Sequence, residues 1–239
     1  MSKQFQKIVY VLALLLSITS IKGQTAEELM LQGVAKKNTN DYTGALQDFN
    51  ASILSTPSFD SYYNRGLVLL LLGNYSSAAR SFSNALSINA NNKLAYLNRG
   101  KAYFATGDYS TATLDFNKVT EMDSLLPEAF YYQGLCSKIA GEYEQAITLY
   151  NKSLSLDAQN SDVYTARAET QYYLENDSAA LQDFDKAIEL NANNALAYFG
   201  RGNCKYAIND KQNACLDWTK ASELKYVEAD TYIKSYCND

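Results

Sequence analysis

The sequence contains no histidine, and this absence removes several kinds of active site from consideration. Histidine is the commonest general base and the commonest zinc ligand in proteins, so every histidine-dependent catalytic triad is impossible here. Proline is nearly absent, with 2 residues, and only 11 glycines occur among 239 residues. Because both residue types interrupt helices, their scarcity favours a chain of helices joined by short polar turns.

The amino terminus resembles a targeting segment rather than part of a fold. Lys3 and Lys7 precede the apolar run 8–16, and a small residue, Gly23, follows it. This order is typical of a secretory signal peptide, and the run is short for a membrane span. We therefore predict that residues 1–23 are a signal peptide removed on export, so that the mature protein is periplasmic or secreted. The alternative is an uncleaved anchor.

Basic residues are outnumbered by acidic ones, which bears on the choice of partner. The whole chain carries a net charge of −5, and removal of residues 1–23 leaves 18 basic and 26 acidic residues, a net charge of −8. A domain this acidic repels phosphate backbones, so nucleic acid is not an expected partner.

Small residues recur at a nearly constant spacing along the chain. They mark six copies of a repeat, at Gly33, Gly66, Gly100, Gly134, Ala168 and Gly202. An alanine lies twelve residues after each of these positions, and a large aromatic lies sixteen after: Phe49, Phe82, Phe116, Tyr150, Phe184 and Trp218. The spacing predicts two antiparallel helices per copy, in contact at the small residues. Such pairs bury their apolar faces only by stacking on one another.

Segments such as AYLNRGKAY (95–103) and GDYSTA (107–112) resemble tetratricopeptide repeats, a family with a period of about 34 residues. The resemblance implies an all-α fold, a right-handed α-solenoid of six stacked helix-turn-helix repeats in residues 24–228, with a capping helix at 229–239. The expected repeat bounds are 26–58, 59–92, 93–126, 127–160, 161–194 and 195–228. Two departures are that the terminal proline survives only as Pro57 and that Ala168 replaces a glycine.

The family holds peptides or partner helices on a concave surface built from the first helix of each repeat. By register, the resemblance implies a partner-binding groove made of Tyr63, Asn64, Leu67, Leu97, Asn98, Lys101, Tyr131, Leu135 and Phe199. The alternative for the large apolar members is a role in packing. Asn64 and Asn98 match a register at which some members hydrogen-bond the backbone of an extended peptide. The lysine and asparagine set with which other members grip a terminal carboxylate is missing, so that mode is not expected.

Arginine precedes the small residue in four copies, as Arg65, Arg99, Arg167 and Arg201. Three of these copies also carry an aspartate fifteen residues after the small residue, as Asp115, Asp183 and Asp217, whereas the copy of Arg65 has Ser81. The pattern predicts a repeated ion pair between the two helices of one copy, with ligand binding as the alternative. A partly exposed pair stabilises a fold by only about a few tenths of a kcal/mol.

The four cysteines do not have the spacing of a zinc site. Cys136 and Cys204 share a register that small core residues occupy in other copies. Cys215 and Cys237 fall on adjacent helices at the end of the stack, and in an oxidising compartment we predict a disulfide between them. The competing pairing is Cys204 with Cys215.

Catalytic motifs, including a phosphate-binding glycine loop and a nucleophile elbow, are not found in the sequence. We therefore expect a non-catalytic scaffold that needs no cofactor and no metal and binds a protein or peptide partner. Contact with a membrane is expected only through an uncleaved signal segment. The alternatives are a structural assembly component of the cell envelope, or a carbohydrate-binding or enzymatic role through the aromatic groove.

Overall fold

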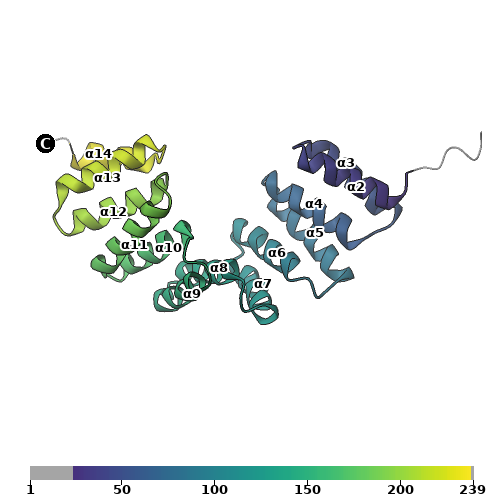
Figure 1. Ribbon diagram of the computed structural model, residues 1–239, viewed down its shortest axis with the longest axis horizontal. Coiled ribbons are helices and arrows are strands. Elements are labelled where there is room, and N and C mark those ends of the chain that lie inside the picture. The colour runs from purple at the N-terminus through teal and green to yellow at the C-terminus, as the bar shows by residue number, and fades with distance from the viewer. Residues whose placement is uncertain (1–23, 238–239) are drawn as a thin grey trace, which may run out of the picture. The chain divides into compact units, whose positions relative to one another are not determined.

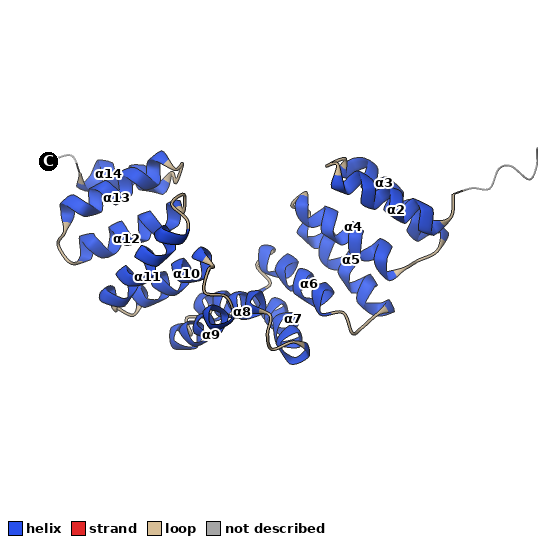
Figure 2. Cartoon of the chain, in the orientation of Figure 1, coloured by secondary structure: helices blue, strands red, loops and turns tan. Residues whose placement is uncertain are grey.

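A computed structural model describes residues 24–237, so the predicted signal peptide at 1–23 lies outside the described residues. Within this range the chain forms thirteen helices and no strand (Figures 1 and 2). The helices are α2 (Ala26–Asn38), α3 (Tyr42–Ser55), α4 (Phe59–Leu71), α5 (Tyr75–Ile88), α6 (Lys93–Ala105), α7 (Tyr109–Met122), α8 (Pro127–Ile139), α9 (Tyr143–Leu156), α10 (Ser161–Tyr173), α11 (Asp177–Leu190), α12 (Ala195–Ala207), α13 (Lys211–Glu223) and α14 (Glu228–Tyr236).

The described helices fall into two compact units, residues 24–95 and residues 96–237, with the division inside α6. In the first unit each helix packs on the next, from α2 to α5. In the second unit the same consecutive packing runs from α7 to α14. The first helices of successive repeats are also in contact: α2 contacts α4, and α10 contacts both α8 and α12. This packing confirms the predicted fold class, an all-α solenoid of helical repeats.

The turns between paired helices follow from local sequence, as the turn from α6 to α7 illustrates. Gly107 has a φ of +82°, in the left-handed region that glycine adopts without a steric penalty. The N–H of Asp108 returns to the carbonyl of Tyr103 at 3.0 Å, which satisfies a carbonyl at the end of α6. The Asp108 carboxylate then accepts the N–H of Thr111 at 3.1 Å and caps α7. One dipeptide thus ends one helix and begins the next.

The small residue of a first helix lies where an aromatic ring of a neighbouring second helix packs against it. A Cβ built on Gly134 would lie 2.5 Å from Cε1 of Tyr150, so only glycine fits without a shift of the ring. In the copy that carries Ala168, the ring of Phe184 is closely approached instead by Gly200 of the following repeat. In this copy the close approach of a glycine to the ring is therefore made by the following repeat.

The last helix covers the end of the second unit. Trp218 of α13 is fully buried, and its ring contacts Tyr232 and Tyr236 of α14 at centroid distances of 5.2 and 5.9 Å. Cys215 is joined to Cys237 by a disulfide, with the two Cα atoms 5.7 Å apart. α14 is therefore attached to α13 both by packing and by a covalent bond.

Candidate functional site

The nine residues expected to line the groove belong to two different units. In the first unit Tyr63, Asn64 and Leu67 lie on α4 and are half-buried. The ring of Tyr63 stacks on Phe59 at 5.5 Å. The side chain of Asn64 accepts a hydrogen bond from Nζ of Lys37 at 2.8 Å. The amide that we assigned to peptide capture is thus already engaged by a neighbouring first helix, α2.

In the second unit the expected residues have different surroundings. Leu97 is only 3% exposed and packs in a core cluster with Ala112 and Phe116, so its assignment to an exposed groove is wrong. The same cluster includes Ala129 and Cys136 of α8, so residues of two neighbouring helices enclose the Leu97 side chain. Asn98 and Lys101 of the same helix are half-buried, and Nζ of Lys101 lies 2.7 Å from Oε1 of Glu128 on α8.

Further along the second unit, the aromatic members of the set are held by internal contacts. Tyr131 packs edge-on against Tyr132, and burial raises the pKa of its hydroxyl above the ordinary value. Phe199 contacts Tyr226 and Tyr232, at ring-centroid distances of 4.9 and 4.8 Å. Leu135, also half-buried, packs against the core cluster that contains Tyr150. These side chains are only partly available to a partner, and the packing alternative applies to much of each ring.

The predicted ion pairs of the second unit are present in all three copies. Each guanidinium donates from Nε and Nη2 to both oxygens of the aspartate on the paired helix. In Arg167 these distances are 2.7 and 2.6 Å to Asp183, and the corresponding pairs are Arg99 with Asp115 and Arg201 with Asp217. The Nη1 atom of Arg167 also donates to Oδ1 of Asn151 on α9, at 2.5 Å. The arginine therefore joins the two helices of its own repeat to the second helix of the preceding one.

These pairs are less exposed than the sequence suggested. The arginine side chains are 18–21% exposed and the aspartate side chains only 5–9%. The pKa of Arg99 is raised, chiefly by its hydrogen bond to Asp115. The expectation that each pair contributes only about a few tenths of a kcal/mol was wrong, because it applies to partly exposed pairs. Here the paired helices and their neighbours exclude water from the carboxylates, so the pairs behave as buried ones.

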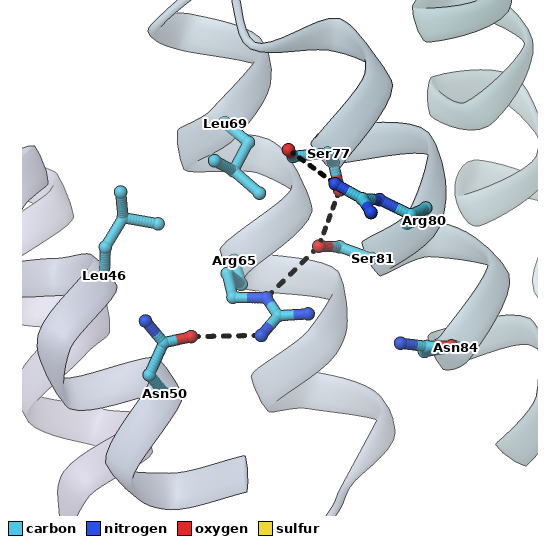
Figure 3. Close-up of a pocket in the computed structure, with 8 residues that line it drawn as sticks. All are labelled: Leu46, Asn50, Arg65, Leu69, Ser77, Arg80, Ser81 and Asn84. Carbon is cyan, nitrogen blue, oxygen red and sulfur yellow. Dashed lines mark hydrogen bonds between the residues drawn. The ribbon is translucent and has the colours of Figure 1, made fainter.

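The copy of Arg65 departs from this pattern, and a cavity is found there. Nε of Arg65 donates to Oγ of Ser81 at 3.2 Å, and Nη1 donates to Oδ1 of Asn50 at 3.0 Å. A cavity of about 410 Å³ lies beside these groups (Figure 3). It is lined by Leu46 and Asn50 of α3, by Arg65 and Leu69 of α4, and by Ser77, Arg80, Ser81 and Asn84 of α5.

Sequence reasoning found Arg65 and Ser81 but overlooked Arg80, which belongs to none of the repeated registers. Arg80 follows Ala78 by two residues, and its Nη2 donates to Oγ of Ser77 at 3.3 Å. The only sequence signal for this site was the substitution of serine at the aspartate register. Two guanidinium groups consequently line one cavity in the first unit.

The cysteines outside the disulfide are buried in the second unit. Burial raises the pKa of Cys204 to about 12 and also raises that of Cys136. A thiol with a raised pKa stays protonated near neutrality and is a poor nucleophile. In the described part of the chain no group of three His, Cys, Asp or Glu residues is placed to hold a metal ion. No helix within residues 24–237 is both long and apolar enough to cross a membrane.

Comparison with known families identifies the repeats. Models of the tetratricopeptide repeat match residues 66–107, 97–161 and 161–194, which together span more than half of the chain. In a sequence comparison no curated protein matches the chain.

Several solved structures share the fold. A tetratricopeptide repeat protein from Parabacteroides merdae is 22% identical and has a TM-score of 0.69, with 89% of this chain and 84% of that chain covered. PilF of Pseudomonas aeruginosa is 18% identical, with a TM-score of 0.73 and coverage of 88% and 97%. YrrB, described as having an unusual peptide-binding site, is 17% identical, with a TM-score of 0.59 and coverage of 78% and 97%. At these identities the likeness establishes the fold alone.

Proposed function

Because the chain belongs to the tetratricopeptide-repeat family, whose scaffolds generally mediate protein–protein interactions, we propose that it is an exported, non-catalytic scaffold that binds a peptide segment or protein subunit. The partner is held on the first helices of its repeats. YrrB, a solved tetratricopeptide-repeat structure described as having an unusual peptide-binding site, is a precedent for peptide binding by this fold.

The observation that carries the proposal is the polar character of contacts between successive first helices. Lys37 meets Asn64 in the first unit, while Lys101 meets Glu128 and Lys138 meets Glu169 in the second, each at 2.7–2.8 Å. Each side chain in these contacts retains donors or acceptors beyond the one that its neighbour uses. Within each unit, polar groups of this kind beside half-buried aromatic rings suit the capture of a peptide by its backbone and a few side chains.

Affinity capture tests the partner site. Residues 24–239 are immobilised, and proteins from the envelope and culture medium of the source organism are applied to the wild type and to the double variant Asn64→Ala/Asn98→Ala. We expect the double variant to lose a partner that the wild type retains, with a free energy of unfolding within about 0.5 kcal/mol of the wild type. The matched control removes two exposed turn amides, Asn91→Ala/Asn193→Ala, and should retain the partner. Equal capture by both variants would contradict the proposed site.

Export is tested separately by mass spectrometry of the protein from its native source. Cleavage after Gly23 predicts an amino terminus at Gln24 in the periplasm or medium. A chain that begins at Met1 in the membrane fraction would show an uncleaved anchor instead.

A further inference from the structure

The three complete arginine–aspartate pairs show what the arginine register binds. In each pair one carboxylate takes both Nε and Nη2 of the guanidinium, the bidentate geometry that arginine offers to planar oxyanions. Ser81 stands in place of that carboxylate beside Arg65 and takes only Nε. Among residues 24–237 no acceptor is found for Nη2 of Arg65. Of the two donors that a carboxylate accepts in the three other arginine copies, only Nε therefore has an acceptor here.

A second cation lines the same cavity without a carboxylate of its own. In the described chain neither Arg65 nor Arg80 has an ion-pair partner, whereas the arginines at the same register as Arg65 in the second unit, Arg99, Arg167 and Arg201, each have one. Burial lowers the pKa of Arg65, and the positive charge of Arg80 acts in the same direction. Two like charges held near one another on an acidic protein are stabilised by an anion placed between them.

The rest of the lining supplies neutral groups that suit an oxyanion. Ser81 is 1% exposed, and its only hydroxyl hydrogen is donated to the carbonyl of Ser77 at 2.9 Å while its oxygen accepts from Arg65, so Ser81 holds the guanidinium in place and offers no donor to a ligand. The neutral donors that remain for an oxyanion are the amide of Asn84 and the hydroxyl of Ser77, which line the cavity (Figure 3). The volume of about 410 Å³ exceeds that of a carboxylate group and admits the side chain that carries it.

We propose that this cavity binds the carboxylate of an aspartate or glutamate side chain supplied by a partner protein. The partner thereby provides between chains the group that Asp115, Asp183 and Asp217 provide within this one. The assignment rests on the proposed function of the chain as a partner-binding scaffold, and it names the partner chemistry at a second surface, made by α3, α4 and α5 rather than by the first helices alone.

The test uses small probes and needs no identified partner. N-acetyl-aspartate N-methylamide carries the side-chain carboxylate, and N-acetyl-asparagine N-methylamide is its neutral match. Each is titrated at constant ionic strength into ¹⁵N-labelled residues 24–239, and the Nε–Hε resonance of Arg65, assigned with Arg65→Lys, is followed by NMR. We expect a saturable shift with the aspartate probe and about tenfold weaker binding or none with the asparagine probe, because the charge is lost.

Two variants check that the response comes from the cavity. Ser81→Asp restores the residue type of the other copies, so it should pair with Arg65, raise the melting temperature by about 2–4 °C and abolish the aspartate-probe shift. Ser87→Asp adds the same charge at an exposed position of α5 and should leave binding nearly unchanged. Arg80→Gln removes an exposed cation and should weaken binding several-fold without loss of folding, which covers the case in which Ser81→Asp does not fold.

Some outcomes would overturn the assignment. Inorganic phosphate that shifts the Arg65 resonance while the aspartate probe does not would show a phosphate site instead. Equal shifts with the aspartate and asparagine probes, or no shift with either, would show that the cavity does not recognise a carboxylate. Loss of a partner in the Asn64 and Asn98 variants is measured independently, so the scaffold function and the carboxylate site fail by different observations.

Discussion

Conversion of Asp183 to serine tests whether the buried ion pairs hold paired helices together. The change reproduces the residue found beside Arg65 and removes two hydrogen bonds, of 2.7 and 2.6 Å, from Arg167. Loss of one partner from a fully buried pair costs about 3–5 kcal/mol. Arg167 is 20% exposed and keeps its bond to Asn151 at 2.5 Å, so we expect a smaller loss, about 2–3 kcal/mol.

The assay is urea denaturation followed by circular dichroism, with the exposed pair on the same helix as control. Lys186 and Glu189 form an i,i+3 pair in which Glu189 is 68% exposed, so Glu189→Ser should cost no more than about 0.5 kcal/mol. A double variant, Arg167→Met/Asp183→Leu, should recover part of the loss, because it leaves no charge unpaired. If Asp183→Ser and Glu189→Ser cost the same, water reaches the Asp183 carboxylate and the reasoning from burial is refuted.

Three further predictions concern the core and the end of the second unit. Gly134→Ala should lower the free energy of unfolding by about 1–3 kcal/mol in urea denaturation, because its Cβ would lie 2.5 Å from the ring of Tyr150; an unchanged midpoint would contradict this. Burial raises the pKa of Tyr150, so the unfolded chain ionises first and stability falls as the pH rises above about 10. Tyr150→Phe removes a buried hydroxyl that has no hydrogen-bond partner among residues 24–237, and should make that fall shallower in thermal melts at pH 8 to 11, with no loss of stability at pH 7. Replacement of Cys215 and Cys237 by serine should cost about 3 kcal/mol, since the bond closes a separation of 22 residues, and peptide mapping that finds Cys237 free in the exported protein would disprove the pairing there.

The registers of small, aromatic and charged residues were sufficient to predict the helical repeats and the ion pairs between paired helices, but not the bidentate geometry of those pairs. The same registers did not reveal which side chains are exposed. Leu97 shares its register with Tyr63 and Tyr131, yet it is 3% exposed while they are half-buried. Exposure depends on the neighbouring helices and not on the spacing within one, so a register identifies a face of a helix but not the accessibility of each residue on it.

The sequence by itself determined the repeat, because a close helix contact needs a small residue and an aromatic one at fixed spacing in every copy. It also determined which arginines find an aspartate on the paired helix. Only the tertiary structure decided how strongly these pairs are buried and that Arg80 shares a cavity with Arg65. The physical reason is that burial and cavity shape arise from three helices packed together, α3, α4 and α5 in the case of the cavity, whereas each periodic signal in the sequence reports on one helix or one pair.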